Sequence, residues 1–333
     1  MLESSVLDSL LTNSSAEAWK VIIDNVLQAA SQPLSLRSAI GEVVKRDREI
    51  GELDNFLSSA GWDLWDAFGD TVERTSDALS RWWIETHSAK AVLILDGLSL
   101  RELPWLLQGA EKHGFAVHRI CAFASELPGE TNEFANSLGF SSRSQLQNNG
   151  ATSSHSFRGA YTESVDMPWM DCEGLINASS DWIFWHHWPD SKIHAAAVAG
   201  QGLETLSLDV AEQLCSDDFW GFLGCLATGR RLVITSDHGY AATGYFPDVD
   251  GKVASFLKTT FASGRSTPGA GDVGPFVPPV VMQLATPHGT HRLAIGRRKW
   301  KSQGGYPTLA HGGLSILETL SPFIEITNSE AFQ

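Results

Sequence analysis

Hydrophobic positions in the first part of the chain recur at the spacing of amphipathic helices. The first such run, which Pro33 closes, consists of Trp19, Ile22, Ile23, Val26, Leu27 and Ala30. A second run extends from Ile40 to Leu57, and a third follows from Trp62 towards Trp82. We therefore expect an N-terminal helical module over residues 1–88, with its tryptophans packed in a core.

After residue 88 the pattern changes to short, continuous apolar runs. These are the segments AVLILD (91–96), FAVHRICAF (115–123), WIFWHH (182–187), RLVITS (231–236), PPVVMQLAT (278–286) and HRLAIG (291–296). Strands without polar alternation are typical of a sheet that helices cover on both faces. Amphipathic segments lie between them, including one that Gly114 ends and a longer one through Leu206 and Val210. We expect an α/β fold over residues 89–333, with a largely parallel sheet flanked by helices.

Composition narrows the classes of function. The chain has 333 residues and a net charge of -15, and residues 1–88 carry 15 acidic against 7 basic side chains. Such a chain is not expected to coat nucleic acid or anionic membranes. No apolar run approaches the roughly 18 residues of a membrane span, and the first residues lack the basic segment of a secretory signal. The four cysteines form no CxxC pair, which predicts a reduced, cytoplasmic protein.

Residues able to bind metal follow several of the predicted strands. They are Asp96, Asp190 with His194 four positions later, Asp237 with His238, and His311 in a glycine-flanked turn. If the strands are parallel, these side chains share one edge of the sheet. Carboxylate oxygen and neutral imidazole nitrogen are ligands of zinc and manganese. The sequence therefore predicts a site for divalent cations, in which the adjacent Asp237 and His238 point to two different ions.

The ordered set of ligands resembles that of the alkaline phosphatase superfamily, and within it the PglZ domain. The likeness rests on VLILDGLSLRELPWL, LVITSDHGY and above all YPTLAHGGLSILETLSPFIEI, and it covers roughly residues 89–326. It implies an alkaline-phosphatase-like core with two divalent ions. One ion would be held by Asp190, His194 and His311, and the other by Asp96, Asp237 and His238. PglZ proteins often carry a carboxylate at the position of His194; nitrogen there favours zinc over manganese.

The resemblance also implies a metal-bound hydroxyl that acts on phosphorus. Thr131 fits best, because it follows a Pro-Gly turn at a predicted helix start, where it could equally be a helix cap. Ser99, close after Asp96, is the second candidate. A basic segment, with Arg297, Arg298, Lys299 and Lys301 around Trp300, is expected to form a lip that binds substrate phosphates while Trp300 stacks on a base. The alternative for this segment is a solvated loop that balances nearby acid.

These features together predict a metal-dependent phosphoesterase of PglZ type. The resemblance implies phosphodiester or phosphomonoester substrates, including nucleic acid or nucleotides, and a role with other proteins of bacteriophage-exclusion (BREX) defence systems or in signalling. One alternative is another hydrolase of the superfamily or a phosphomutase, which would need an insert that this core is too short to hold. The other is a non-catalytic interaction subunit that keeps the metal site for folding. The substrate, the native metal, the oligomeric state and the role of residues 1–88 are left open by the sequence.

Overall fold

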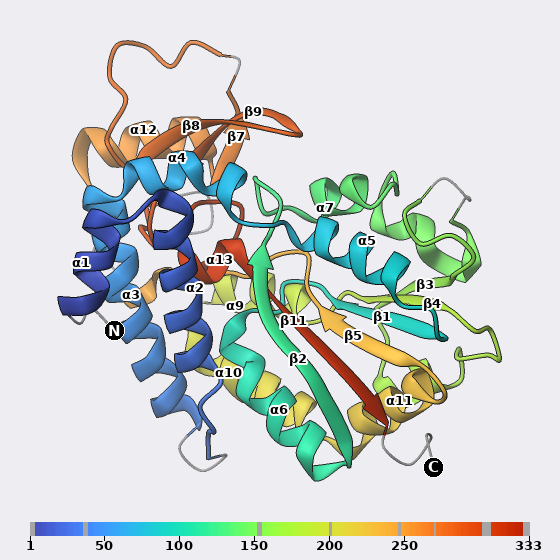
Figure 1. Ribbon diagram of the computed structural model, residues 1–333. Coiled ribbons are helices and arrows are strands. Elements are labelled where there is room, and N and C mark those ends of the chain that lie inside the picture. Colours follow the sequence, from blue (N-terminus) through green and yellow to red (C-terminus); the bar gives the residue numbers. More distant parts are fainter. Residues whose placement is uncertain are drawn as a thin grey trace.

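A six-stranded sheet lies at the centre of the protein (Figure 1). In the computed structural model, which describes residues 4–35, 39–151, 155–199, 202–245, 248–269, 271–301 and 308–328, its strand order is β2-β11-β5-β1-β4-β3. The strands are β1 (Lys90–Leu95), β2 (Phe115–Ala124), β3 (Tyr161–Val165), β4 (Trp182–His186), β5 (Arg231–Thr235) and β11 (Leu320–Asn328). β1, β3, β4 and β5 run parallel, whereas β11 runs antiparallel to both of its neighbours.

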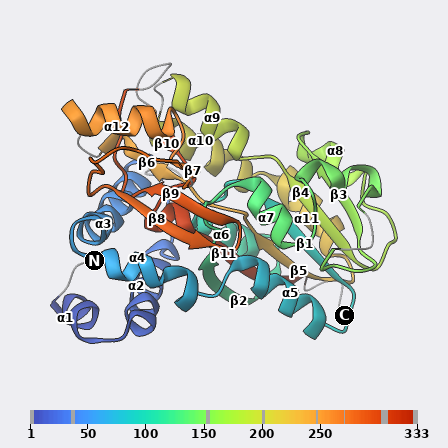
Figure 2. The same cartoon turned by 90° about the horizontal axis from the view of Figure 1, so that it is seen from above.

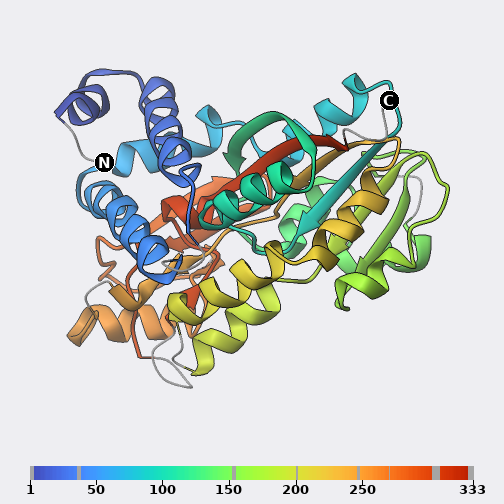
Figure 3. The ribbon, with the colours of Figure 1, turned by 90° about the horizontal axis from the view of Figure 1, so that it is seen from below.

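Helices cover both faces of this sheet. Along β1, Ala91, Leu93 and Leu95 belong to one buried cluster, whereas Val92 and Ile94 belong to the other. The first face is covered by α6 (Leu103–Lys112), α10 (Gly202–Leu214) and α11 (Asp217–Ala227), as seen in Figure 3. The opposite face is covered by α5 (Thr75–Glu85) and α7 (Thr131–Ser137), which lie towards the viewer in Figure 2. This alternation of apolar contacts explains why the strand has no polar face.

Helices also make up the first 88 residues. They are α1 (Ser4–Thr12), α2 (Ser15–Ala30), α3 (Ala39–Ala60), α4 (Trp62–Thr71) and α5. The third predicted helix is thus divided, because Val72 is extended and Arg74 bridges to the sheet. Trp19, Trp65 and Phe68 pack with ring centroids 4.7–5.5 Å apart, within the same buried cluster as one face of β1. The predicted fold class, helices followed by a largely parallel α/β sheet, is confirmed; the division into two domains at residue 88 stays a prediction.

A second, smaller sheet corrects one expectation. The apolar runs near residues 281 and 291 do not join the central sheet but form the antiparallel pair β8 (Val281–Thr286) and β9 (Gly289–Ala294). Only Pro287 and His288 separate them, and so short a connection allows only an antiparallel hairpin. β7 (Ser266–Pro268) completes this sheet, and α12 (Gly251–Phe261) packs beside it.

Short elements complete the described structure. They are the 3-10 turns η1 (Leu100–Glu102), η2 (Arg143–Asn149) and η3 (Thr243–Tyr245), the helices α8 (Trp169–Glu173), α9 (Asp190–Ala199) and α13 (Ile316–Thr319), and the paired strands β6 (Ala241–Ala242) and β10 (Leu309–Ala310). In the part of the chain that is described, no helix combines the length and apolar character needed to cross a bilayer.

Candidate metal centre

Three parallel strands end at one edge of the sheet and place the predicted ligands there. Asp96 directly follows β1, Asp190 begins α9 after β4, and Asp237 with His238 follows β5. Two hydrogen bonds hold these segments together: the Asp190 N–H donates to the Asp96 carbonyl at 2.9 Å, and the Gly97 N–H donates to Asp237 Oδ1 at 3.0 Å. The parallel register therefore brings together side chains that are far apart in sequence.

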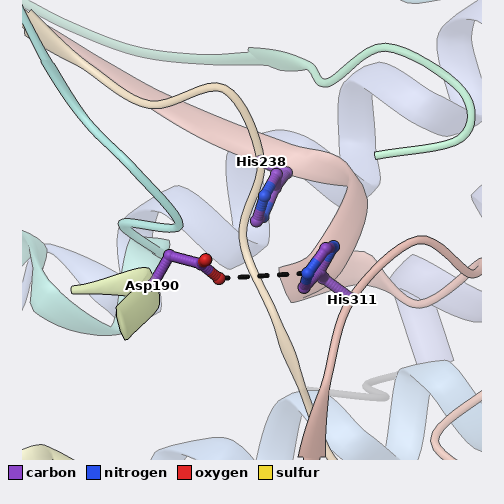
Figure 4. Close-up of side chains that lie close together, drawn as sticks. All are labelled: Asp190, His238 and His311. Carbon is purple, nitrogen blue, oxygen red and sulfur yellow. Dashed lines mark ion pairs between the residues drawn. The ribbon is translucent and has the colours of Figure 1, made fainter. Parts of the chain in front are cut away.

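Two groups of ligand atoms form among the described residues. One consists of Asp96, Asp237 and His238, and the other of Asp190, His238 and His311, with the ligand atoms of each group within 4.8 Å of one another. His238 Nε2 lies 3.5 Å from Asp237 Oδ2 and 3.8 Å from Asp96 Oδ1. His311 Nε2 lies 3.9 Å from Asp190 Oδ1, and its ring stacks on that of His238 with centroids 4.1 Å apart (Figure 4).

Several ligand atoms are buried without a partner. Asp190 Oδ1, Asp237 Oδ2 and His238 Nε2 make no hydrogen bond within the described part of the chain. Leaving such atoms unsatisfied away from water costs on the order of 1–3 kcal/mol each, and more for a charged oxygen. One cation in each group of ligand atoms would satisfy all three, because carboxylate oxygen and imidazole nitrogen both donate electron pairs. The residues therefore fit a divalent metal ion.

Backbone groups fix the orientation of the ligands. His238 Nδ1 lies 2.9 Å from the Gly239 carbonyl oxygen, and His311 Nδ1 lies 3.0 Å from that of Gly129. With the proton on Nδ1 donated to a carbonyl, Nε2 presents its lone pair to the site, as metal-binding histidines commonly do. Asp237 Oδ1 accepts from the Gly97 and His238 N–H groups, which leaves Oδ2 for a ligand. Gly239 is required here, since a Cβ atom would lie 2.1 Å from the Leu317 carbonyl oxygen.

Charge at the site favours a cation. Burial would raise the pKa of Asp190, but the hydrogen bond with His194 and the charges of His238 and His311 lower it to about 2. Burial would lower the pKa of His238, but Asp237 and Asp190 outweigh it and raise this pKa above its usual value. Burial and the neighbouring His238 lower the pKa of His311. The lowered pKa keeps the Asp190 carboxylate negatively charged beside these imidazoles, and such a group attracts positive charge.

His194 lies outside both groups. Its side chain is 65% exposed, and its Nε2 lies 3.3 Å from Asp190 Oδ2. Its ring centroid is 5.4 Å from that of His311. The structure therefore places His194 at the rim of the site, next to two predicted ligands, whereas His238 belongs to both groups of ligand atoms.

The two candidate hydroxyl groups have different surroundings. Thr131 is the first residue of α7, as expected, and its Oγ1 lies 3.4 Å from Asp96 Oδ1. Ser99 is fully buried, caps η1, and donates its hydroxyl to the Leu317 carbonyl at 3.3 Å. Thr131 is half-buried and faces the metal ligands, whereas the Ser99 hydroxyl is engaged in local structure. The geometry favours Thr131.

Two further charged residues reach the site and were missed in the sequence. The Arg143 guanidinium, at the start of η2, pairs with Asp96 Oδ2 although the two residues are 47 positions apart. Glu130 Oε2 lies 3.6 Å from His311 Nδ1. Glu130 precedes Thr131 and could have been noticed by that adjacency. Arg143 follows no apolar strand, so no local pattern points to it.

The predicted basic lip is wrong for Arg297 and Trp300. Arg297 is fully buried and pairs with Asp47 and Asp54, each at 2.6 Å. Trp300 is 3% exposed, and its indole N–H donates to a backbone carbonyl. Lys299 pairs with Asp248 at 3.1 Å. Buried charges need partners, and the acidic α3 supplies them for Arg297. Arg298 and Lys299 are partly exposed, and Lys301 is exposed.

Comparisons with known proteins gave matches among solved structures. No protein-family model and no curated protein sequence matches the chain. The chain is similar to murine ectonucleotide pyrophosphatase/phosphodiesterase 5 as an inactive variant in complex with AMP, with a TM-score of 0.48 and 11% identity over 72% of this chain and 88% of that one. For the same murine protein in a second structure, the TM-score is 0.46 and the identity 12%, over 71% and 87% of the two chains.

Proposed function

We propose that this protein is a divalent-metal-dependent phosphoesterase of the alkaline phosphatase superfamily. The observation that carries the proposal is the convergence of unsatisfied Asp190, Asp237 and His238 atoms beside the Thr131 hydroxyl. A structural site would need only the ligands. Cleavage of a phosphate ester requires in addition a nucleophile and a group that binds phosphate. The Thr131 hydroxyl and the Arg143 guanidinium both contact the Asp96 carboxylate and can supply these two functions.

Zinc suits the ligands best, with manganese as the alternative. Because Nδ1 of His238 is taken by the Gly239 carbonyl, only its Nε2 can bind, and it serves one ion. We assign His238 to the ion held by Asp96 and Asp237. Asp190 and His311 would hold the second ion, with His194 as the nearest additional ligand. Bound divalent ions would polarise the phosphoryl group and offset the charge that develops on it.

The protein's own groups would divide the chemistry as follows. Thr131 Oγ1 would release its proton to solvent and attack phosphorus to form a P–O bond, while the bond from phosphorus to the leaving oxygen breaks and that oxygen takes up a proton from solvent. Asp96 Oδ1, 3.4 Å from Thr131 Oγ1, orients the hydroxyl. Arg143, whose side chain is 26% exposed, is able to hold the non-reacting phosphate oxygens with its fork of N–H donors. Water then hydrolyses the phosphothreonine and restores the hydroxyl.

The decisive experiment measures metal content and hydrolysis of bis-(p-nitrophenyl) phosphate and p-nitrophenyl phosphate together. Wild-type protein is expected to bind two ions per chain and to cleave at least one ester. Thr131→Ala should keep both ions and lose turnover, Thr131→Ser should keep part of it, and the control Ser99→Ala should stay active. Turnover by Thr131→Ala would show that the nucleophile is misassigned. Two bound ions without turnover of either ester would favour the non-catalytic subunit instead.

We also propose the PglZ type for this enzyme, with nucleic acid or nucleotide substrates and a cytoplasmic role in bacteriophage exclusion together with other defence proteins. The support for this finer proposal is the resemblance of the segments around Asp96, Asp237 and His311. The exposed Lys301 and the partly exposed Arg298, which follow the hairpin, could contact a longer substrate. Cleavage of a dinucleotide or of single-stranded DNA, compared with the two chromogenic esters, tests it. Equal rates on all of them would argue against a nucleic-acid substrate.

A further inference from the structure

Helix α3 carries two acidic side chains into the interior. Asp47 and Asp54 are seven residues apart, which places them two turns apart on one face of the helix. Each is only 1% exposed, although α3 belongs to the acidic first part of the chain and ends 30 residues before β1 begins. Aspartate is seldom fully buried unless it is paired, so these two positions call for an explanation.

Both carboxylates bind arginines from later segments of the chain, Arg101 of η1 and Arg297 after β9. Asp47 Oδ1 accepts from Arg101 Nε at 2.8 Å, from Arg101 Nη2 at 2.6 Å and from Arg297 Nη1 at 2.6 Å. Asp54 Oδ2 accepts from Arg297 Nε at 2.6 Å, and its Oδ1 accepts from the Ile316 backbone N–H at 2.7 Å. The formal charges of two acids and two arginines cancel, in a region with almost no exposed surface.

The same network ends on the segments that carry the metal ligands. Arg101 lies five residues after Asp96, and its Nη1 donates to the Tyr240 carbonyl at 2.7 Å, two residues after His238. Its guanidinium also lies 4.5 Å from the centroid of the Tyr240 ring. Ile316, which Asp54 holds by its backbone, lies five residues after His311. Each ligand-bearing segment except the one after β4 is thus tied, directly or through one arginine, to α3.

Stability does not explain such a network. Removing four charged groups from water costs about as much as their attraction returns, and well-packed apolar residues would serve stability as well or better. A fixed set of short hydrogen bonds does provide one thing that apolar contacts do not, namely a defined position for the groups it touches. Outer-shell contacts of this kind tune metal affinity by orienting the first ligands.

We infer that Asp47 and Asp54 are positioning residues of the metal centre, which makes α3 a working part of the site and not an appended module. The inference rests on the proposed function, since it concerns the ions that Asp96, Asp237, His238 and their neighbours would hold. Asp47 acts through Arg101 on the backbone of Tyr240. Asp54 acts directly on the backbone that follows His311.

The test compares Zn²⁺ binding by variants of the 333-residue chain that each change one buried side chain of α3. Asp47→Asn removes the charge that holds both arginines, whereas the control Leu57→Ala removes a fully buried apolar side chain of the same helix. Zn²⁺ affinity is measured by calorimetry on protein shown to be folded by circular dichroism. The visible spectrum of Co²⁺-loaded protein reports the ligand geometry. We expect Asp47→Asn to weaken Zn²⁺ binding by about tenfold or more and to alter the Co²⁺ spectrum. Leu57→Ala should leave both at wild-type values.

A second variant covers the case in which Asp47→Asn does not fold. Arg101→Lys keeps a positive charge beside Asp47, but a single ammonium group cannot also reach the Tyr240 carbonyl, so the same loss of affinity is expected. Wild-type affinity in Asp47→Asn or Arg101→Lys, or an equal loss in Leu57→Ala, would overturn the inference. Wild-type protein that binds no Zn²⁺ would overturn the proposed function itself, which separates the two failures.

Discussion

Glu102 offers a quantitative test of how the core beneath the site is built. Its carboxyl group is 2% exposed, accepts from the Tyr240 hydroxyl at 2.6 Å and accepts from the Ser99 backbone N–H at 2.7 Å. Burial raises the pKa of Glu102 to about 7, against the opposing effect of these hydrogen bonds and of Arg101. The folded protein therefore holds this proton more tightly than the unfolded chain does.

The sign of the effect on stability follows from the proton balance. Between about pH 4.5 and 7 the folded state binds more protons at Glu102 than the unfolded state, so the contribution of this group falls as the pH rises. It is fully present below about pH 4.5 and is lost as the pH passes the folded pKa near 7. At 1.36 kcal/mol for each pH unit, the difference between the two pKa values corresponds to about 3 kcal/mol.

The assay is urea unfolding at a series of pH values for wild type, Glu102→Gln and the exposed control Glu111→Gln. Titration of all other groups is shared, so the difference in unfolding free energy isolates position 102. From pH 4.5 to pH 8, the unfolding free energy of Glu102→Gln should rise by about 3 kcal/mol relative to that of wild type. The cost of the lost hydrogen bond does not vary with pH, so it leaves this rise unchanged. Glu111→Gln should show no such trend. A constant difference for Glu102→Gln across this range would refute the reasoning that burial dominates at Glu102.

Four other variants test the site and its surroundings. His311→Ala should lower the metal content by one ion per chain. His194 is exposed, so His194→Ala should keep both ions and bind one of them more weakly. Atomic emission after dialysis distinguishes these outcomes, and full metal content in His311→Ala would contradict the assignment. Arg143→Ala should lower kcat/KM on phosphate esters about tenfold or more without loss of metal, because a charged hydrogen bond to phosphate is worth about 1.5–3 kcal/mol; unchanged kinetics would exclude it from substrate binding. Arg297→Ala should lower the free energy of unfolding by about 3–5 kcal/mol, because it leaves buried carboxylates without their partner. A normal urea midpoint together with a raised KM would instead support the original prediction that Arg297 binds substrate.

Local sequence determined the parallel strands and where their carboxyl ends place ligands. The apolar runs of β1, β4 and β5 could be recognised because burial on both faces leaves no polar alternation. The residues after them, such as Asp96 and Asp237, then had to share an edge, since parallel strands end on the same side. Thr131 could be expected at a helix start, because it follows a Pro-Gly turn. These features depend on neighbours in the chain and on one rule of topology.

Only the tertiary structure decided which distant groups meet. Asp47 and Arg297 are 250 residues apart, and a basic cluster that looks solvent-exposed in the sequence is in part a buried partner of α3. Arg143 reaches Asp96 from a turn that has no apolar pattern, and His238 belongs to both groups of ligand atoms. Periodicity reports which face of an element is buried, but it carries no information on what that face meets. The pairing of charges depends on the packing of whole helices against the sheet, and for that reason it emerged only from the folded chain.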